Sequence, residues 1–151
     1  MELGTILAIM QVADRVIEIA KYCVETIRGA PSDLVSVLTE TSMLKVVLQQ
    51  LEVLSKHESR TSAILSSLCQ PEGPIEHVHQ LLQDIERLFP AALKATQHGT
   101  NIRRDKIARA TALLVFVFKQ HKAAKLLQDL LLYKTAINLA VTTELAFVSP
   151  I

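Results

Sequence analysis

Residues 3–34, LGTILAIMQVADRVIEIAKYCVETIRGAPSDL, decide the fold class of this chain. Their polar positions follow one another at steps of one, three and four residues, which draws a single narrow polar stripe along a helix. The remaining positions are apolar or small, so most of the helix surface must be buried against other helices. Gly29 suits the position after a helix end and Pro31 cannot continue a helix. We therefore predict a helix from Leu3 to Arg28 at the centre of a helical bundle.

Four further segments carry apolar residues at helical spacing: 33–56, 61–69, 74–89 and 102–143. Ser32 or Asp33 is expected to cap the first of these, and Pro74 to begin the third. In the last segment no Gly or Pro forces a break, so it is either one long helix or two helices that meet near residues 119–123. The sequence thus predicts an all-α bundle of four to six helices over residues 1–144, followed by a short tail over 145–151.

The composition agrees with one intracellular, helical domain. The chain has 151 residues, half of them hydrophobic and only 4% aromatic, which is enough for one domain with a packed core of Leu, Val, Ile and Ala. No uncharged run approaches the roughly 20 residues that a membrane span needs, and no secretory signal is visible. Cys23 and Cys69 lie in apolar helical patterns, where buried, reduced thiols are expected. We expect a cytoplasmic location.

Charge is distributed unevenly in a chain whose net charge is only +1. Residues 103–125 contain one acidic residue, Asp105, against seven basic residues, which are Arg103, Arg104, Lys106, Arg109, Lys119, Lys122 and Lys125. Such a cluster is either a solvated helix face or a binding surface for an anionic partner, such as a membrane or another protein. No nucleic-acid-binding motif accompanies it, so nucleic acid is not an expected partner.

A search for catalytic chemistry yields no candidate. His77 and His79 are two residues apart and point to different sides of a helix, so they cannot share a metal ion. Glu72, Glu76 and nearby acids fall on the outer face of an amphipathic helix, and the glycines are isolated and form no phosphate loop. We expect no catalytic residue, no metal and no cofactor, and hence a protein that is not an enzyme.

Five sequence blocks stand out along the chain: MQVADRVI at 10–17, APSDL at 30–34, ETSMLKVVL at 40–48, PEGPIE at 71–76 and KLLQDLLLYKTAINLAVTTE at 125–144. Together they resemble the HeLo-like N-terminal domain of fungal NOD-like receptors, which are STAND NTPases. They occur in the expected order and cover the chain from about residue 3 to 144. Related sequences tend to carry a Trp-Pro pair where this chain has Phe116 and Val117, and the loss of the proline favours an unbroken helix there.

The resemblance implies an effector or signalling domain that acts in programmed cell death or innate-immune-type signalling. It implies self-association on activation, a move from cytoplasm to plasma membrane and, if the chain is part of a longer protein, receptor domains downstream in cis. The basic residues of 103–125 make an anionic membrane surface the candidate partner. The candidate membrane or oligomer residues carried over are Leu3, Ile6, Leu7, Met10, Asp14, Glu18 and Lys21. The alternative is a protein–protein adaptor that does not touch lipid.

Overall fold

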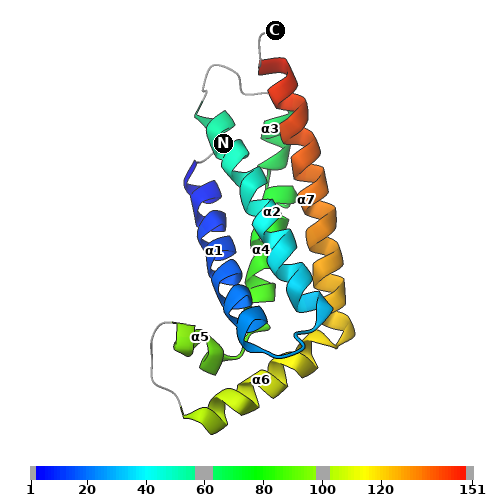
Figure 1. Ribbon diagram of the computed structural model, residues 1–151. Coiled ribbons are helices and arrows are strands. Elements are labelled where there is room, and N and C mark those ends of the chain that lie inside the picture. Colours follow the sequence, from blue (N-terminus) through cyan, green and yellow to red (C-terminus); the bar gives the residue numbers. More distant parts are fainter. Residues whose placement is uncertain (1–2, 57–62, 98–102, 149–151) are drawn as a thin grey trace.

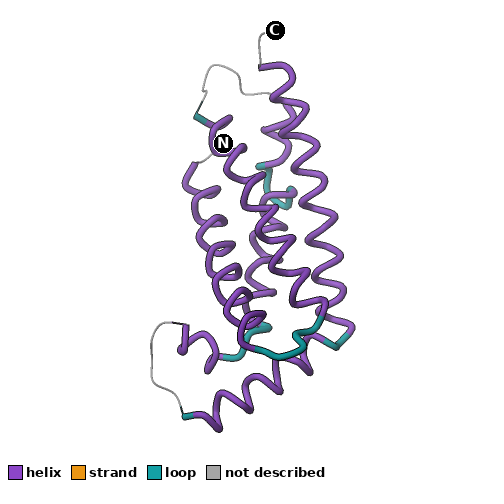
Figure 2. The backbone as a smooth tube through the Cα atoms, viewed as in Figure 1, coloured by secondary structure: helices purple, strands orange, loops and turns teal. Residues whose placement is uncertain are grey.

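The computed structural model describes residues 3–56, 63–97 and 103–148. This part of the chain forms seven helices and no strand (Figure 2). They are α1 (Leu3–Thr26), α2 (Ser32–Ser55), α3 (Ala63–Leu68), α4 (Pro74–Arg87), α5 (Ala91–Gln97), α6 (Arg104–Phe118) and α7 (His121–Val148). The prediction of an all-α bundle is confirmed. The predicted count of four to six helices is too low, because α5 is a separate helix and the last third of the chain is divided in two.

Four helices, α1, α2, α4 and α7, form the body of the molecule (Figure 1). α1 packs against α2 and α4, and α7 packs against the same two helices from the other side. α5 adds a third neighbour to α1, and α6 packs on α5 and α7 at one end of the bundle. The expectation that the first helix has neighbours on at least two sides is confirmed. However, α1 lies at a corner of the four-helix arrangement and not at its centre, because its polar stripe faces solvent.

The core is aliphatic and draws on every long helix. Buried side chains of α1 recur at steps of three and four, and they include Ile6, Ile9, Val16 and Cys23. They meet the buried face of α2, listed as Leu34, Val37, Thr41, Leu44, Val47, Leu48, Leu51 and Leu54. The predicted amphipathic pattern is thus the packing pattern, because side chains three and four residues apart share one helix face.

The turns use local backbone chemistry. Gly29, after α1, has φ +71°, a left-handed conformation that glycine adopts at little cost. The expected side-chain cap on α2 was wrong: Pro31 is the N-cap, and no side chain caps this helix end. Pro74 begins α4 as predicted. Before it, a Cβ on Gly73 would come within 2.8 Å of the Gln70 carbonyl oxygen, so this turn requires glycine.

The last third of the chain breaks between α6 and α7, so the unbroken helix favoured by the missing proline is wrong. The N–H groups of Lys119 and Gln120 donate to the carbonyls three residues back, at 3.1 Å in both cases, which tightens the end of α6. Phe118 is buried and its ring lies 5.5 Å from the ring of Phe89. This tertiary contact holds α6 beneath the bundle. α7 continues to Val148, beyond the predicted end at Thr143.

Candidate functional site

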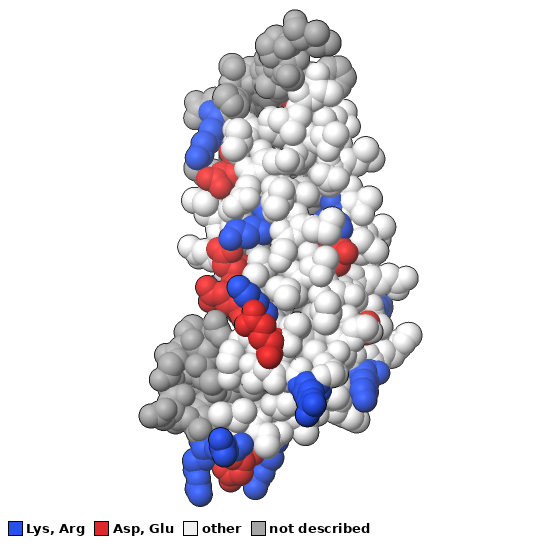
Figure 3. Space-filling view, in the orientation of Figure 1, with Lys and Arg blue, Asp and Glu red and all other residues white. Residues whose placement is uncertain are grey.

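The seven predicted basic residues gather at one end of the bundle. Arg103 precedes α6, the next three lie on α6, Lys119 follows it, and Lys122 and Lys125 lie in the first turns of α7. All seven are exposed. In Figure 3 basic side chains crowd the end of the molecule that α6 occupies in Figure 1. The sequence cluster is therefore also a cluster in space, which we call the basic end.

Neutralisation of the basic end by acids is slight. Arg103 Nε lies 3.9 Å from Asp105 Oδ1, and 84% and 56% of these two side chains are exposed. An ion pair at this distance, between side chains this exposed to solvent, contributes little attraction. No other ion pair involves the basic end among the residues that the structure describes. The end therefore keeps a strong positive potential, which suits an anionic surface.

Two large apolar side chains share the outer face of α6 with these cations. Leu113 is 51% exposed and Phe116 is 61% exposed. With Arg109 and Lys119 they form a series at steps of four, three and three residues, so all four side chains point outward along one stripe. The sequence analysis missed the exposure of this apolar pair. The buried positions Ala110, Leu114 and Phe118 lie on the opposite side of α6. Their spacing of four residues is the sequence pattern from which the exposure of Leu113 and Phe116 could have been predicted.

The candidate residues of α1 divide between the core and the surface. Ile6 is buried, Met10 is half-buried and Leu7 is 40% exposed, whereas Glu18 and Lys21 are exposed. The side chain of Leu3 lies outside the described residues. The first turns of α1 and the basic end lie at opposite ends of the bundle (Figure 1). The structure therefore does not bring the two predicted sets of residues into one site.

The polar stripe of α1 is tied to both neighbouring long helices. Asp14 Oδ1 lies 2.6 Å from Lys45 Nζ on α2. Arg15 Nε donates to Glu86 Oε2 on α4 at 2.8 Å, and this hydrogen bond is the main cause of the raised pKa of Arg15. No local pattern points to such pairs, because their partners come from different helices; Arg15 and Glu86 are 71 positions apart.

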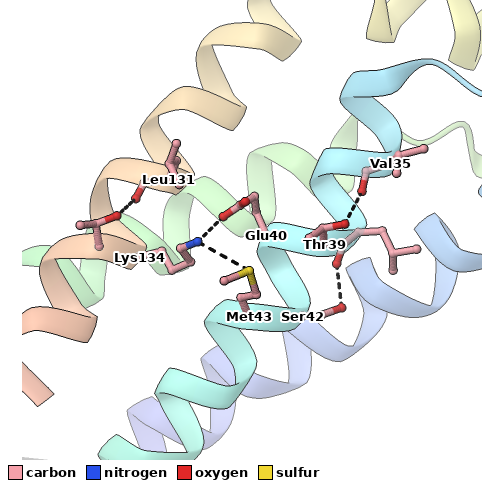
Figure 4. Close-up of polar contacts among 9 residues, drawn as sticks. Val35, Thr39, Glu40, Ser42, Met43, Leu131 and Lys134 are labelled. Atoms are coloured by element: carbon pink, nitrogen blue, oxygen red, sulfur yellow. Dashed lines mark hydrogen bonds and ion pairs between the residues drawn. The ribbon is translucent and has the colours of Figure 1, made fainter. Parts of the chain in front are cut away.

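A third interhelical ion pair joins α2 to α7. Lys134 donates to Glu40 and its Nζ also lies 3.9 Å from Met43 Sδ (Figure 4). Only 11% and 21% of the Lys134 and Glu40 side chains are exposed. Beside this pair α2 and α7 form an open groove of about 400 Å³, lined by Met43, Val46, Val47, Gln50, Lys134, Thr135 and Asn138. The groove is uncharged apart from the neutralised lysine.

The thiols lie in surroundings that suppress their reactivity. Cys23 is fully buried, and burial raises its pKa to about 12. Cys69 was predicted to be buried, but it is only half-buried. This partial burial also raises the pKa of its thiol. Cys69 lines a hollow of about 500 Å³ between α1, α3 and α4, together with Glu76 and His79. Because nucleophilic attack requires a thiolate, neither cysteine has the surroundings of a catalytic one at neutral pH.

The histidines of α4 have structural contacts. The His77 ring stacks on Tyr133 of α7, with centroids 5.3 Å apart, and His79 lies within hydrogen-bond distance of Gln83.

Within residues 3–56, 63–97 and 103–148, no three His, Cys, Asp or Glu side chains are grouped as metal ligands. In the same ranges no helix has the length and apolarity to cross a bilayer.

Comparisons with protein-family models, with curated proteins and with solved structures gave no match.

Proposed function

We propose that this chain is a non-enzymatic effector domain of the HeLo-like type, the type found at the N-terminus of fungal NOD-like receptors. It acts in programmed cell death or innate-immune-type signalling, through oligomerisation and engagement of an anionic membrane. The observation that carries the membrane part is the basic end, since residues 103–125 carry seven exposed cations and a single acid. Each cation close to an anionic leaflet contributes about 1 kcal/mol to binding.

The packing of α1 argues that the isolated domain is quiescent. Release of α1 would expose five large aliphatic side chains: Ile6, Ile9, Val12, Val16 and Ile19. At about 1.5–3 kcal/mol each, the cost is on the order of 10 kcal/mol. Whole domains are stable by about 5–15 kcal/mol, so spontaneous release of α1 would be as rare as global unfolding. Any role of α1 in membranes therefore requires a trigger, which clustering of several domains would supply.

Leakage from dye-loaded vesicles tests the proposal. The domain, alone and clustered through a fused coiled coil, is added to phosphatidylcholine vesicles with and without phosphatidylserine. We expect the clustered form to release dye only from the anionic vesicles, and less at high salt, because screening weakens surface electrostatics. The proposal is wrong if neither form binds or permeabilises anionic vesicles.

A matched pair of variants tests α1 within the same assay. Leu7 on α1 and Leu139 on α7 are both exposed, at 40% and 68%, so glutamate at either position leaves the core intact. We expect Leu7→Glu to abolish leakage and Leu139→Glu to retain it. Far-ultraviolet circular dichroism checks that both variants are folded. Equal leakage from both would remove α1 from the proposal.

The groove between α2 and α7 favours an adaptor as the second candidate function. Exposed apolar residues flank it on both helices, among them Val46 at 54% and Leu131 at 47% exposure. Figure 3 shows a broad uncharged band over this face. A helix of a protein partner could cover such a groove. The test is downstream signalling in cells that express the clustered domain. If the chain is an adaptor, Val46→Glu should abolish this signalling, whereas substitution of the cations of the basic end should leave it unchanged.

A further inference from the structure

The outer face of α6 combines exposed cations with exposed large apolar side chains. Other exposed apolar residues of the described chain, on the middle of α2 and the later turns of α7, lie on a face with few charges. On α6, Leu113 and Phe116 lie between Arg109 and Lys119 on one stripe. Exposed apolar side chains framed by basic residues are characteristic of helices that lie in a membrane interface.

The fold explains why this face is free. Ala110, Leu114 and Phe118 already anchor α6 to the rest of the molecule, through the opposite side of the helix. The apolar pair does not belong to the core cluster of the described residues, and half or more of each side chain is exposed. Long basic side chains can extend towards headgroups while the apolar groups go deeper.

We propose that the outer face of α6 is the surface on which this domain docks on an anionic lipid bilayer, with Phe116 and Leu113 inserted at the boundary between headgroups and acyl chains. Charge complementarity selects lipid as the occupant, since residues 103–125, which contain the pair, carry seven exposed cations and a single acid, Asp105. This inference deepens the proposed function and rests on its membrane part. It assigns docking to α6 and leaves α1 packed in the bundle, so docking needs no release of α1.

The absence of tryptophan from the chain allows a direct test, because a single introduced tryptophan reports only on its own position. Phe116→Trp is placed on the proposed surface, and Leu139→Trp, at a comparably exposed position on α7, is its matched control. Both are titrated, as the full chain, with phosphatidylcholine vesicles with and without phosphatidylserine. We expect the emission of the Phe116→Trp variant to shift to the blue and to be quenched by brominated lipid only in anionic vesicles. The emission of the Leu139→Trp variant should not change.

Binding measurements on two further pairs separate the components of docking. Leu113→Ser with Phe116→Ser should weaken binding to anionic vesicles at least ten-fold, whereas Leu132→Ser with Leu139→Ser should change it less than two-fold. Arg109→Glu should weaken binding at least five-fold, while Lys56→Glu, the same charge change directly after α2 at the far end of the bundle, should not. Circular dichroism verifies the folding of each variant.

The outcomes of these experiments distinguish the inference from the proposed function. If the wild-type domain binds anionic vesicles but the Phe116→Trp emission does not shift and the α6 variants bind as wild type does, the α6 surface is wrong and the membrane function stands. If the wild-type domain binds no anionic vesicle, alone or clustered, both are wrong. An emission shift of the Phe116→Trp variant that is equal in neutral and anionic vesicles would also overturn the electrostatic argument.

Discussion

Thr41 carries a hydroxyl that has no hydrogen-bond partner among the residues that the structure describes. It is fully buried on α2, in the middle of the face that meets the core. A buried hydroxyl without a partner loses its hydration and regains nothing, which costs about 1–3 kcal/mol. This residue is therefore a local defect in an otherwise aliphatic core.

Thr41→Val should raise the free energy of unfolding by about 1 kcal/mol, since valine has the same shape and no polar atom to desolvate. The matched control is Thr39→Val on the same helix, where the exposed hydroxyl donates to the Val35 carbonyl oxygen at 3.1 Å (Figure 4). There we expect a change within about 0.5 kcal/mol. Urea denaturation measures both. Destabilisation by Thr41→Val would mean that the hydroxyl has a partner in solution.

Cys23 makes a prediction about alkaline pH. Its pKa is about 12 in the folded protein, against an ordinary value near 9 that applies to the unfolded chain. Between these values the unfolded chain has lost the proton and the folded protein has kept it, so stability falls as pH rises. The contribution from this one thiol is at most about 1.4 kcal/mol per pH unit.

The measurement is the pH dependence of the free energy of unfolding above pH 9, compared between wild type and Cys23→Ala. Subtraction of the two curves removes the contribution of the lysines and tyrosines, which titrate in the same range. We expect the wild-type curve to fall more steeply than the variant curve. Parallel curves would indicate that Cys23 is not deeply desolvated.

At the scale of the helices, three ion pairs join different helices in the part of the chain that the structure describes. Two of them join α1 to α2 and α4 and are partly exposed, so each contributes little. The pair between Glu40 and Lys134 is more enclosed and links α2 to α7. Removal of one partner there leaves the other charge with little access to water.

Glu40→Leu or Lys134→Met alone should lower the free energy of unfolding by about 1–3 kcal/mol, whereas the double variant should be close to wild type. A double-mutant cycle in urea gives the coupling energy directly. Lys45→Met with Asp14→Leu, between α1 and α2, provides the comparison cycle, with coupling expected below about 1 kcal/mol. Equal coupling in the two cycles would show that enclosure of the α2–α7 pair has no energetic effect.

For the whole molecule, the packing of α1 predicts how the domain opens. Its buried face is continuous with that of α2, so α1 should not detach while the remaining bundle stays folded. Amide hydrogen exchange of the isolated domain should give protection in the middle of α1 within about 1 kcal/mol of that in α2. Much faster exchange in α1, with α2 and α7 still protected, would mean that α1 is released separately.

Much of this arrangement follows from the order of the residues alone. Apolar spacing predicted α1, α2 and α4, and Gly29 and Pro74 marked a helix end and a helix start correctly, because helix periodicity and turn chemistry are properties of neighbouring residues. The cap of α2 and the depth of Cys69 were misjudged, since several local solutions were open there. The cluster of seven cations was also visible in the sequence, because they lie within 23 consecutive residues.

Only the tertiary structure decided what distant residues do to one another. The break after Phe118 has no Gly or Pro to cause it. A continuous helix of roughly 60 Å would lose the contact between the rings of Phe118 and Phe89. The chain bends because the Phe118 ring is buried in that contact. The same bend turns Leu113 and Phe116 outward among the cations. The corner position of α1 and its pairing with Lys45 and Glu86 likewise depend on which helices pack together, and helix packing is a property of the whole chain.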